Sequence, residues 1–142
     1  MRVLGLDVGD RRIGVALSDA LGITAQQLTV LERHAMSADV QAVEQLIAHH
    51  HAEHLVVGMP LTMAGAQGPQ AKKVVAFVDG LRRRLTVPIH WIDERLTTVQ
   101  GQRALREIGA SRRKRHQVID QVAAQLILQQ FLDMQPREDH AA

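Results

Sequence analysis

The chain has 142 residues, of which 46% are apolar and 23% charged, a composition typical of one soluble globular domain with a substantial core. It contains no cysteine, which excludes disulfides, zinc–thiolate sites and thiol nucleophiles. No apolar stretch approaches the length of a membrane span, and the chain opens on a strand pattern rather than a cleavable signal. We therefore expect a cytoplasmic protein that does not bind membranes.

The net charge is only +2, but the basic residues are clustered at Arg82-Arg83-Arg84 and at Arg112-Arg113-Lys114-Arg115. Such clusters can bind phosphates or can simply be solvated helix ends and loops. The first lies on the polar side of a predicted helix, which favours the solvated interpretation. The second precedes Asp120, discussed below, which favours nucleic-acid binding. With two Phe, one Trp and no Tyr in the chain, stacking on bases is not expected.

The first apolar run, residues 3–8, predicts a central strand buried on both faces, and Gly9 and Asp10 lead into a second strand over residues 13–17. Together they predict a β-hairpin. The strand carries one carboxylate, Asp7, which needs a partner inside a sheet, and a divalent cation is one solution. A frayed strand end whose carboxylate accepts turn amides is the alternative.

Residues 28–31 predict a third antiparallel strand, followed by a helix that Ser37 or Asp39 can cap and that carries Val40, Val43, Leu46 and Ile47. Histidines 49–51 and 54 at its end cannot converge on one ion, so we expect a solvated helix terminus. Residues 54–61 predict a buried strand that Pro60 ends. The glycine-rich segment 62–68 is either a ligand-approach loop or a plain connector.

Apolar residues from Val74 to Leu85 predict a helix, residues 89–93 a fifth strand, and Thr97 with Gln100 a capping box that opens a short helix to Ile108. A basic loop and a last helix follow. This order predicts an α/β fold, a five-stranded mixed sheet of three antiparallel strands and then βαβ crossovers, flanked by helices. Residues 1–134 form one domain in this interpretation, and residues 135–142 a disordered polar tail.

The last helix places Asp120 on the same face as four apolar residues, Ala123, Ala124, Ile127 and Phe131, so its carboxylate faces the sheet. A helix N-terminal carboxylate that interacts with the dipole is the alternative. Asp93 and Glu94 add acids at the end of the fifth strand. Carboxylates around divalent ions, with basic residues to hold the phosphates, are the standard apparatus for phosphodiester hydrolysis. The candidate bases are Arg11, Arg12, Arg95 and the cluster Arg112, Arg113, Lys114 and Arg115.

Several motifs in this order resemble the YqgF/RuvX family: Gly5-Leu6-Asp7-Val8-Gly9, Arg12-Ile13-Gly14-Val15-Ala16, Val57-Gly58-Met59-Pro60-Leu61, Asp93-Glu94-Arg95-Leu96-Thr97-Thr98 and Asp120-Gln121-Val122-Ala123-Ala124. The resemblance implies an RNase H-like fold related to Holliday-junction resolvases. It further implies an Mg²⁺- or Mn²⁺-dependent endonuclease that matures the small-subunit (16S) ribosomal RNA precursor, with Asp7, Glu94 and Asp120 as catalytic and metal-binding acids.

The sequence departs from the resolvases at the strand beside the first, which carries a glutamate in those proteins but no acid in residues 55–58 here. In the RNase H-like strand order Glu94 is two strands from Asp7, about 9–10 Å. We hypothesise that Gly58, which has no side chain, leaves room for Glu94 to reach inward. Asp93 is the substitute if the register shifts by one residue.

Three other functions compete with this one. The first is a Holliday-junction resolvase, and the second is a non-catalytic nucleic-acid-binding or ribosome-assembly factor. The third is an actin-like ATPase, which needs two such domains to enclose a nucleotide. The expected partners are a structured ribosomal RNA precursor or branched DNA, and ribosomal assembly intermediates. Both a monomer and a homodimer are compatible with the sequence.

Overall fold

The computed structural model describes residues 1–97 and 112–136, and for residues 112–121 it describes the backbone alone. Its elements in chain order are β1 (Val3–Val8), β2 (Arg12–Ser18), β3 (Ala25–Glu32), α1 (Met36–His50), β4 (His54–Met59), α2 (Pro69–Arg82), β5 (Ile89–Asp93), the 3₁₀ helix η1 (Glu94–Leu96) and α4 (Arg112–Met134). The sheet has the order β3-β2-β1-β4-β5. β1 pairs antiparallel with β2 and parallel with β4, so the predicted mixed sheet is confirmed.

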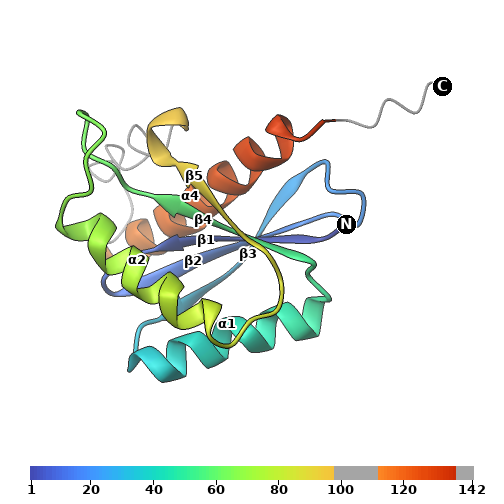
Figure 1. Ribbon diagram of the computed structural model, residues 1–142, viewed down its shortest axis with the longest axis horizontal. Helices are drawn as coiled ribbons and strands as arrows, with labels where there is room; N and C mark the ends of the chain where they lie inside the picture. The colour runs from blue at the N-terminus through green and yellow to red at the C-terminus, as the bar shows by residue number, and fades with distance from the viewer. Residues whose placement is uncertain (98–111, 137–142) are drawn as a thin grey trace.

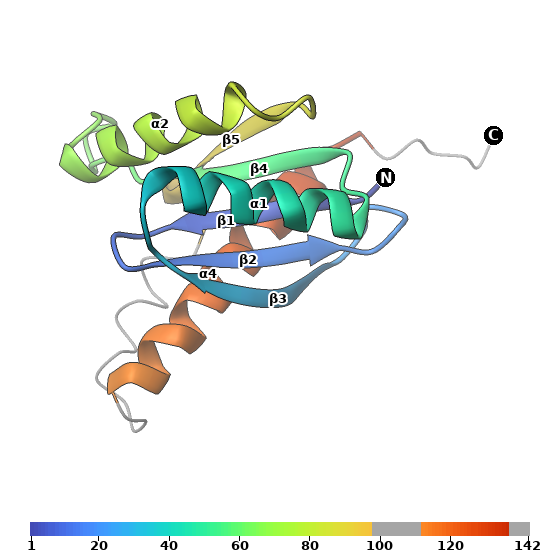
Figure 2. The same cartoon turned by 90° about the horizontal axis from the view of Figure 1, so that it is seen from below.

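The sheet is covered on both faces, by α1 and α2 on one side and by α4 on the other (Figures 1 and 2). All six residues of β1 are therefore buried, as the continuous apolar run predicted. Leu4, Leu6 and Val8 belong to the core under α1 and α2. Val3 belongs to the core under α4. Because side chains alternate along a strand, Asp7 points to the α4 face.

Small residues let α4 lie close to the sheet. A Cβ at Gly5 would be only 2.8 Å from the Cβ of Leu128 and 3.4 Å from the carbonyl oxygen of Ala124. Ala123 and Ala124 are fully buried on this face. The close approach of the helix brings its buried side against the strands that carry the candidate acids.

Helix boundaries differ from the predictions at two places. The N-cap of α1 is Ala35 and makes no side-chain cap bond. Asp39 instead accepts hydrogen bonds from the backbone N–H of His34 and from Arg33, because as a buried carboxylate it needs strong donors. The basic segment from Arg112 is helical rather than a loop, in agreement with the high helix propensity of Arg and Lys.

Two predicted elements fall outside the described residues. The helix predicted to run from Thr97 to Ile108 falls, from residue 98 on, in the undescribed part of the chain, and so does the tail from residue 137. Within the described part, the Thr97 hydroxyl donates to the Glu94 carbonyl and closes η1. None of the described helices is long and apolar enough to cross a bilayer.

The histidines at the end of α1 divide into two groups. His51 ends the helix in the left-handed conformation, with φ of 55°. His54, expected at the same solvated terminus, instead opens β4, and its Nδ1 is 3.0 Å from Nε2 of His90 on β5. One ring must donate and the other accept, so at least one of them is neutral. The His90 ring also packs 4.9 Å from that of Phe131 on α4.

This environment predicts an acid-sensitive stability. Burial, and then the nearby His54, lowers the pKa of His90 below its ordinary value. A histidine whose pKa is lower in the folded than in the unfolded protein makes its full contribution to the free energy of unfolding above about pH 6.5. That contribution is lost as the pH falls through the lower, folded-state pKa. We expect the Tm of wild type to fall more steeply between pH 7.5 and 5.5 than that of His90→Gln, which cannot titrate. Parallel Tm curves would contradict the prediction.

Candidate active site

Asp7 is held inside the sheet rather than at a frayed end. It lies within β1 opposite Gly14 of β2, and only 3% of it is exposed to solvent. It occupies the α4 face one residue before the end of the strand. A carboxylate so placed cannot be solvated by bulk water, which is the environment in which a cation becomes the natural counter-charge.

Glu94 reaches the same face from the end of the edge strand β5. It is the first residue of η1 and 6% exposed. Its Oε2 and Cγ lie 3.1 and 3.2 Å from the point where a Cβ of Gly58 would be, so the glutamate lies directly over that glycine. This is the contact that was hypothesised from the missing side chain of Gly58.

The two carboxylates are thereby brought close to each other. Leu6 pairs with Val57, so the next residues along these parallel strands, Asp7 and Gly58, are neighbours on the α4 face. A carboxylate lying over Gly58 is one strand spacing from Asp7, about 4.8 Å, instead of two. Carboxylates that project on the same face from neighbouring positions supply the oxygen donors that a hard divalent cation prefers.

Asp93, the substitute for Glu94, has a different role. Its carboxylate accepts hydrogen bonds from Nε and Nη2 of Arg95, the latter at 2.7 Å, and from the backbone N–H of Arg95. These side-chain bonds hold the pKa of Asp93 below its ordinary value. It is therefore Glu94, and not Asp93, that the structure places over Gly58.

Arg95 also reaches the glycine-rich loop, residues 62–68. Its Nη1 donates to the carbonyl of Met63 at 3.4 Å, and the loop closes on itself through a hydrogen bond of 2.9 Å from the Thr62 N–H to the Ala66 carbonyl. The loop is thus tied to the turn that carries Glu94. In this arrangement Arg95, a candidate nucleic-acid contact, uses its guanidinium on protein groups.

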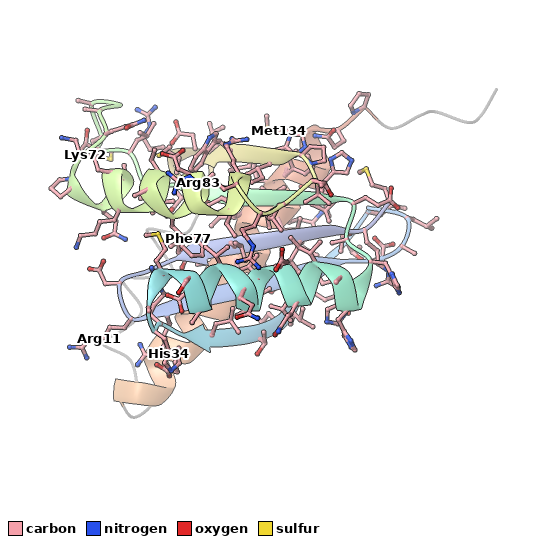
Figure 3. The ribbon with its side chains drawn as sticks, turned by 60° about the horizontal axis from the view of Figure 1, so that its bottom comes forward. Arg11, His34, Lys72, Phe77, Arg83 and Met134 are labelled. Atoms are coloured by element: carbon pink, nitrogen blue, oxygen red, sulfur yellow. The ribbon has the colours of Figure 1, made fainter. Side chains whose placement is uncertain are left out.

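The other basic candidates are placed differently from one another. Arg11 is exposed in the β1–β2 turn, at the same end of the molecule as Lys72 of α2 (Figure 3). The side chain of Arg12 is only 15% exposed and lies 3.6 Å from Glu32, its partner on β3. Side chains 112–121 are outside the described residues, which leaves the roles of Arg112, Arg113, Lys114, Arg115 and Asp120 as predictions. Among the side chains that are described, no three acids or histidines form a metal-binding group.

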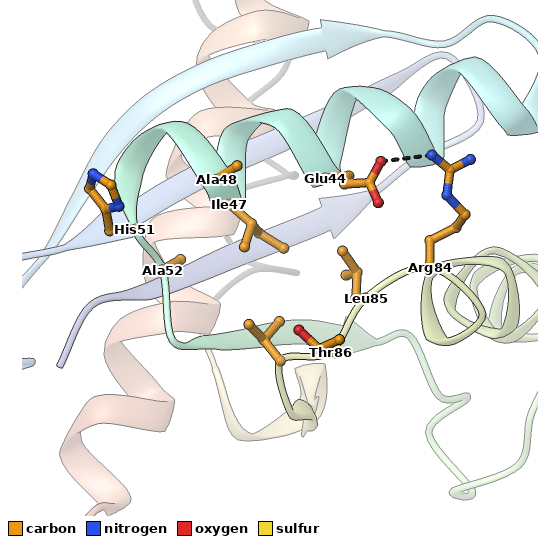
Figure 4. Close-up of a pocket in the computed structure, with 9 residues that line it drawn as sticks. Glu44, Ile47, Ala48, His51, Ala52, Arg84, Leu85 and Thr86 are labelled. Carbon is orange, nitrogen blue, oxygen red and sulfur yellow. Dashed lines mark hydrogen bonds and ion pairs between the residues drawn. The ribbon is translucent and has the colours of Figure 1, made fainter.

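A pocket of about 360 Å³ lies away from these carboxylates (Figure 4). It is formed between α1 and the segment that joins α2 to β5, with Ile47 and Leu85 on its walls and an ion pair of 2.8 Å between Glu44 and Arg84 at its rim. Since α1 covers the face of the sheet opposite to Asp7, this pocket is not part of the acidic site.

The strand order β3-β2-β1-β4-β5, with helices on both faces of the sheet, is that of the RNase H-like fold. The chain is similar to the solved Thermus thermophilus RuvC in complex with a Holliday junction substrate, with a TM-score of 0.57 and 17% identity over 93% of each chain. It is also similar to the fowlpox virus resolvase bound to Holliday junction DNA, with a TM-score of 0.54 and 9% identity over 94% of this chain and 97% of that one. At these identities the likeness concerns the fold.

Similarity in sequence identifies the family to which the chain belongs. The family model described as "RuvX: Holliday junction resolvase" matches residues 1–134. A Moorella thermoacetica protein, whose name gives a provisional assignment as a pre-16S rRNA nuclease, is 53% identical over 94% of this chain and 95% of its own length. A Myxococcus xanthus protein of the same name is 47% identical over 94% of this chain and 88% of its own. The chain belongs to the RuvX family, and the resemblance and nuclease class predicted from its motifs are confirmed.

Proposed function

We propose that this protein is a divalent-metal-dependent endonuclease that hydrolyses phosphodiester bonds in the precursor of 16S ribosomal RNA in the cytoplasm. One observation carries the site: Glu94 lies over Gly58, on the strand next to Asp7, so that two buried carboxylates share one face at one end of the sheet. The substrate class is that named for the relatives from Moorella and Myxococcus.

The donor set fits Mg²⁺ or Mn²⁺, because both ions prefer carboxylate oxygens. Asp7 and Glu94 would hold the ion, with Asp120 as the expected third ligand. Asp120 precedes Ala124, which packs on Gly5, by about one helical turn of α4. When bound, the ion would supply Lewis-acid stabilisation of charge on the phosphate and a lower pKa for attacking water.

The protein's own groups would orient this site and hold the substrate. Gly58 gives Glu94 its space, and the Asp93–Arg95 pair fixes the turn from which Glu94 projects. Arg11, exposed in the turn after Asp7, is the described cation best placed to contact the phosphate backbone. Such contacts would neutralise the negative charge of the substrate's phosphates.

Phosphate binding by Arg11 predicts a change in salt dependence. We expect Arg11→Gln to weaken RNA binding at low salt and to reduce the slope of log K against log salt by about 0.7–0.9, the value for one lost phosphate contact. Arg83, the C-cap of α2, is also exposed, and Arg83→Gln is the matched control that should keep the wild-type slope. Filter binding at several salt concentrations measures both. Equal slopes for Arg11→Gln and wild type would contradict the assignment.

The test of the function is cleavage of two labelled substrates, a 16S rRNA precursor and a four-way DNA junction, each with Mg²⁺, with Mn²⁺ and with chelator. We expect the RNA to be cut with metal and to stay intact in chelator. Preferential cutting of the junction would move the function to recombination, the activity in the description of the family. Binding of both without cutting of either would favour an assembly factor and would contradict the proposal.

A further inference from the structure

Arg33, just after β3, connects three parts of the molecule on the face opposite to the acids. Its Nε donates to Oδ2 of the buried Asp39 at 2.8 Å. Its Nη1 donates to the carbonyl oxygen of Gly9 at 2.8 Å. Its guanidinium carbon lies 5.0 Å from the centre of the ring of Phe77, which packs between α1 and α2 (Figure 3). One planar group makes all three contacts, which the ammonium of a lysine cannot do.

Two of the contacts of residue 33 end on the β1–β2 turn, which begins two residues after Asp7. The side chain of Arg33 binds the Gly9 carbonyl, and its backbone N–H donates to the Arg11 carbonyl at 2.8 Å. The turn also closes internally, through a bond of 2.8 Å from the Gly9 N–H to the Arg12 carbonyl. Residue 33 therefore holds both Gly9 and Arg11 of the turn by their carbonyl groups.

The anchoring decides what the turn presents to the substrate. In a planar trans peptide the carbonyl and the following N–H point in opposite directions. Since the Gly9 carbonyl is held toward Arg33, the N–H of Asp10 is aimed away from the core under α1 and α2. The side chain of Arg11, whose carbonyl is likewise held, stays exposed.

We propose that Arg33 is a positioning residue for the nuclease: by holding the β1–β2 turn it fixes the end of the strand that carries Asp7 and the direction of Arg11. The inference rests on the proposed function. A purely structural role requires only the pair with Asp39, whereas positioning requires the bond to Gly9 as well. The two roles can be separated by variants that break one contact and keep the other.

Arg33→Lys retains a positive charge for Asp39 but loses the second arm that reaches Gly9. Asp39→Asn weakens the ion pair and leaves the arm to Gly9 in place. We expect both to lower the Tm. Arg33→Lys alone should slow single-turnover cleavage at saturating enzyme, by about 10- to 100-fold, the loss that follows from a small misplacement of catalytic groups. Asp39→Asn should cleave within about twofold of wild type.

Amide hydrogen exchange of Gly9 and of residue 33, whose N–H groups donate to the carbonyls of Arg12 and Arg11, is the second readout, and it needs no activity. We expect faster exchange at these amides in Arg33→Lys than in Asp39→Asn. Cleavage that falls equally in the two variants, or amides at these positions that exchange alike, would overturn the inference. A wild type that cuts neither substrate would instead refute the nuclease function, while the exchange comparison would still decide whether Arg33 holds the turn.

Discussion

Replacing Asp7 by Asn is expected to reduce single-turnover cleavage of the RNA precursor by about 10³-fold or more, equivalent to at least about 4 kcal/mol of transition-state stabilisation. The substitution keeps the size of a side chain that is 3% exposed and opposite Gly14, but it removes the negative charge that a divalent cation needs. RNA affinity should stay within about twofold of wild type, since the proposed phosphate contact is Arg11 and not Asp7.

Asp10→Asn is the matched control for this variant. Asp10 lies three residues further along, its side chain is 60% exposed, and its partner is the exposed Lys73 at 3.3 Å. Exposed ion pairs of this kind contribute little, so cleavage and Tm should both stay near wild type. If Asp7→Asn cut the RNA at the wild-type rate in Mg²⁺, Asp7 would not be a metal-binding acid of this site.

The fold was predictable because each of its signals is local. The continuous apolar run of β1 required burial on both faces, and the structure supplies helices on both. Pro60, directly after β4, marked a strand end that the sequence alone locates. The apolar spacing around Val43 located α1. The predicted cap was wrong, because Asp39 accepts hydrogen bonds from Arg33 and His34 instead of capping the helix.

The site was predictable in its residue types but not in its contacts. Gly58 was informative because it has no side chain, which leaves the space over β4 that the side chain of Glu94 occupies. Arg95 and Arg12 looked like phosphate ligands, yet both lie beside acids, Asp93 and Glu32, that no local pattern assigns to them. The pairing of His54 with His90 depends on the register of two strands distant in the sequence. The role of Arg33 could not be predicted from the sequence, because its side chain binds Gly9, which is 24 residues away along the chain.

The space above Gly58 predicts the second large effect. A Cβ at this position would lie 2.5 Å from Cδ1 of Ile127 and 3.1 Å from Oε2 of Glu94, so in Gly58→Ala both side chains must move. Overpacking against Ile127 should lower the stability by about 1–3 kcal/mol. Displacement of Glu94 should lower single-turnover cleavage by about 10²-fold or more, because catalytic groups tolerate little misplacement. The measurements are Tm and cleavage at saturating enzyme.

Two further variants separate stability from catalysis. Ile127→Val deletes the Cδ1 atom that the new Cβ would strike, so adding it to Gly58→Ala should recover part of the lost Tm while cleavage stays low. Val43→Ala deletes buried atoms in the core under α1 and α2, on the face opposite to Glu94, and should lose stability but keep cleavage. If cleavage instead followed Tm through all three variants, Gly58 would serve only the packing of α4. If cleavage falls wherever Glu94 is displaced and nowhere else, the glycine is the residue that lets an acid from η1 act beside Asp7.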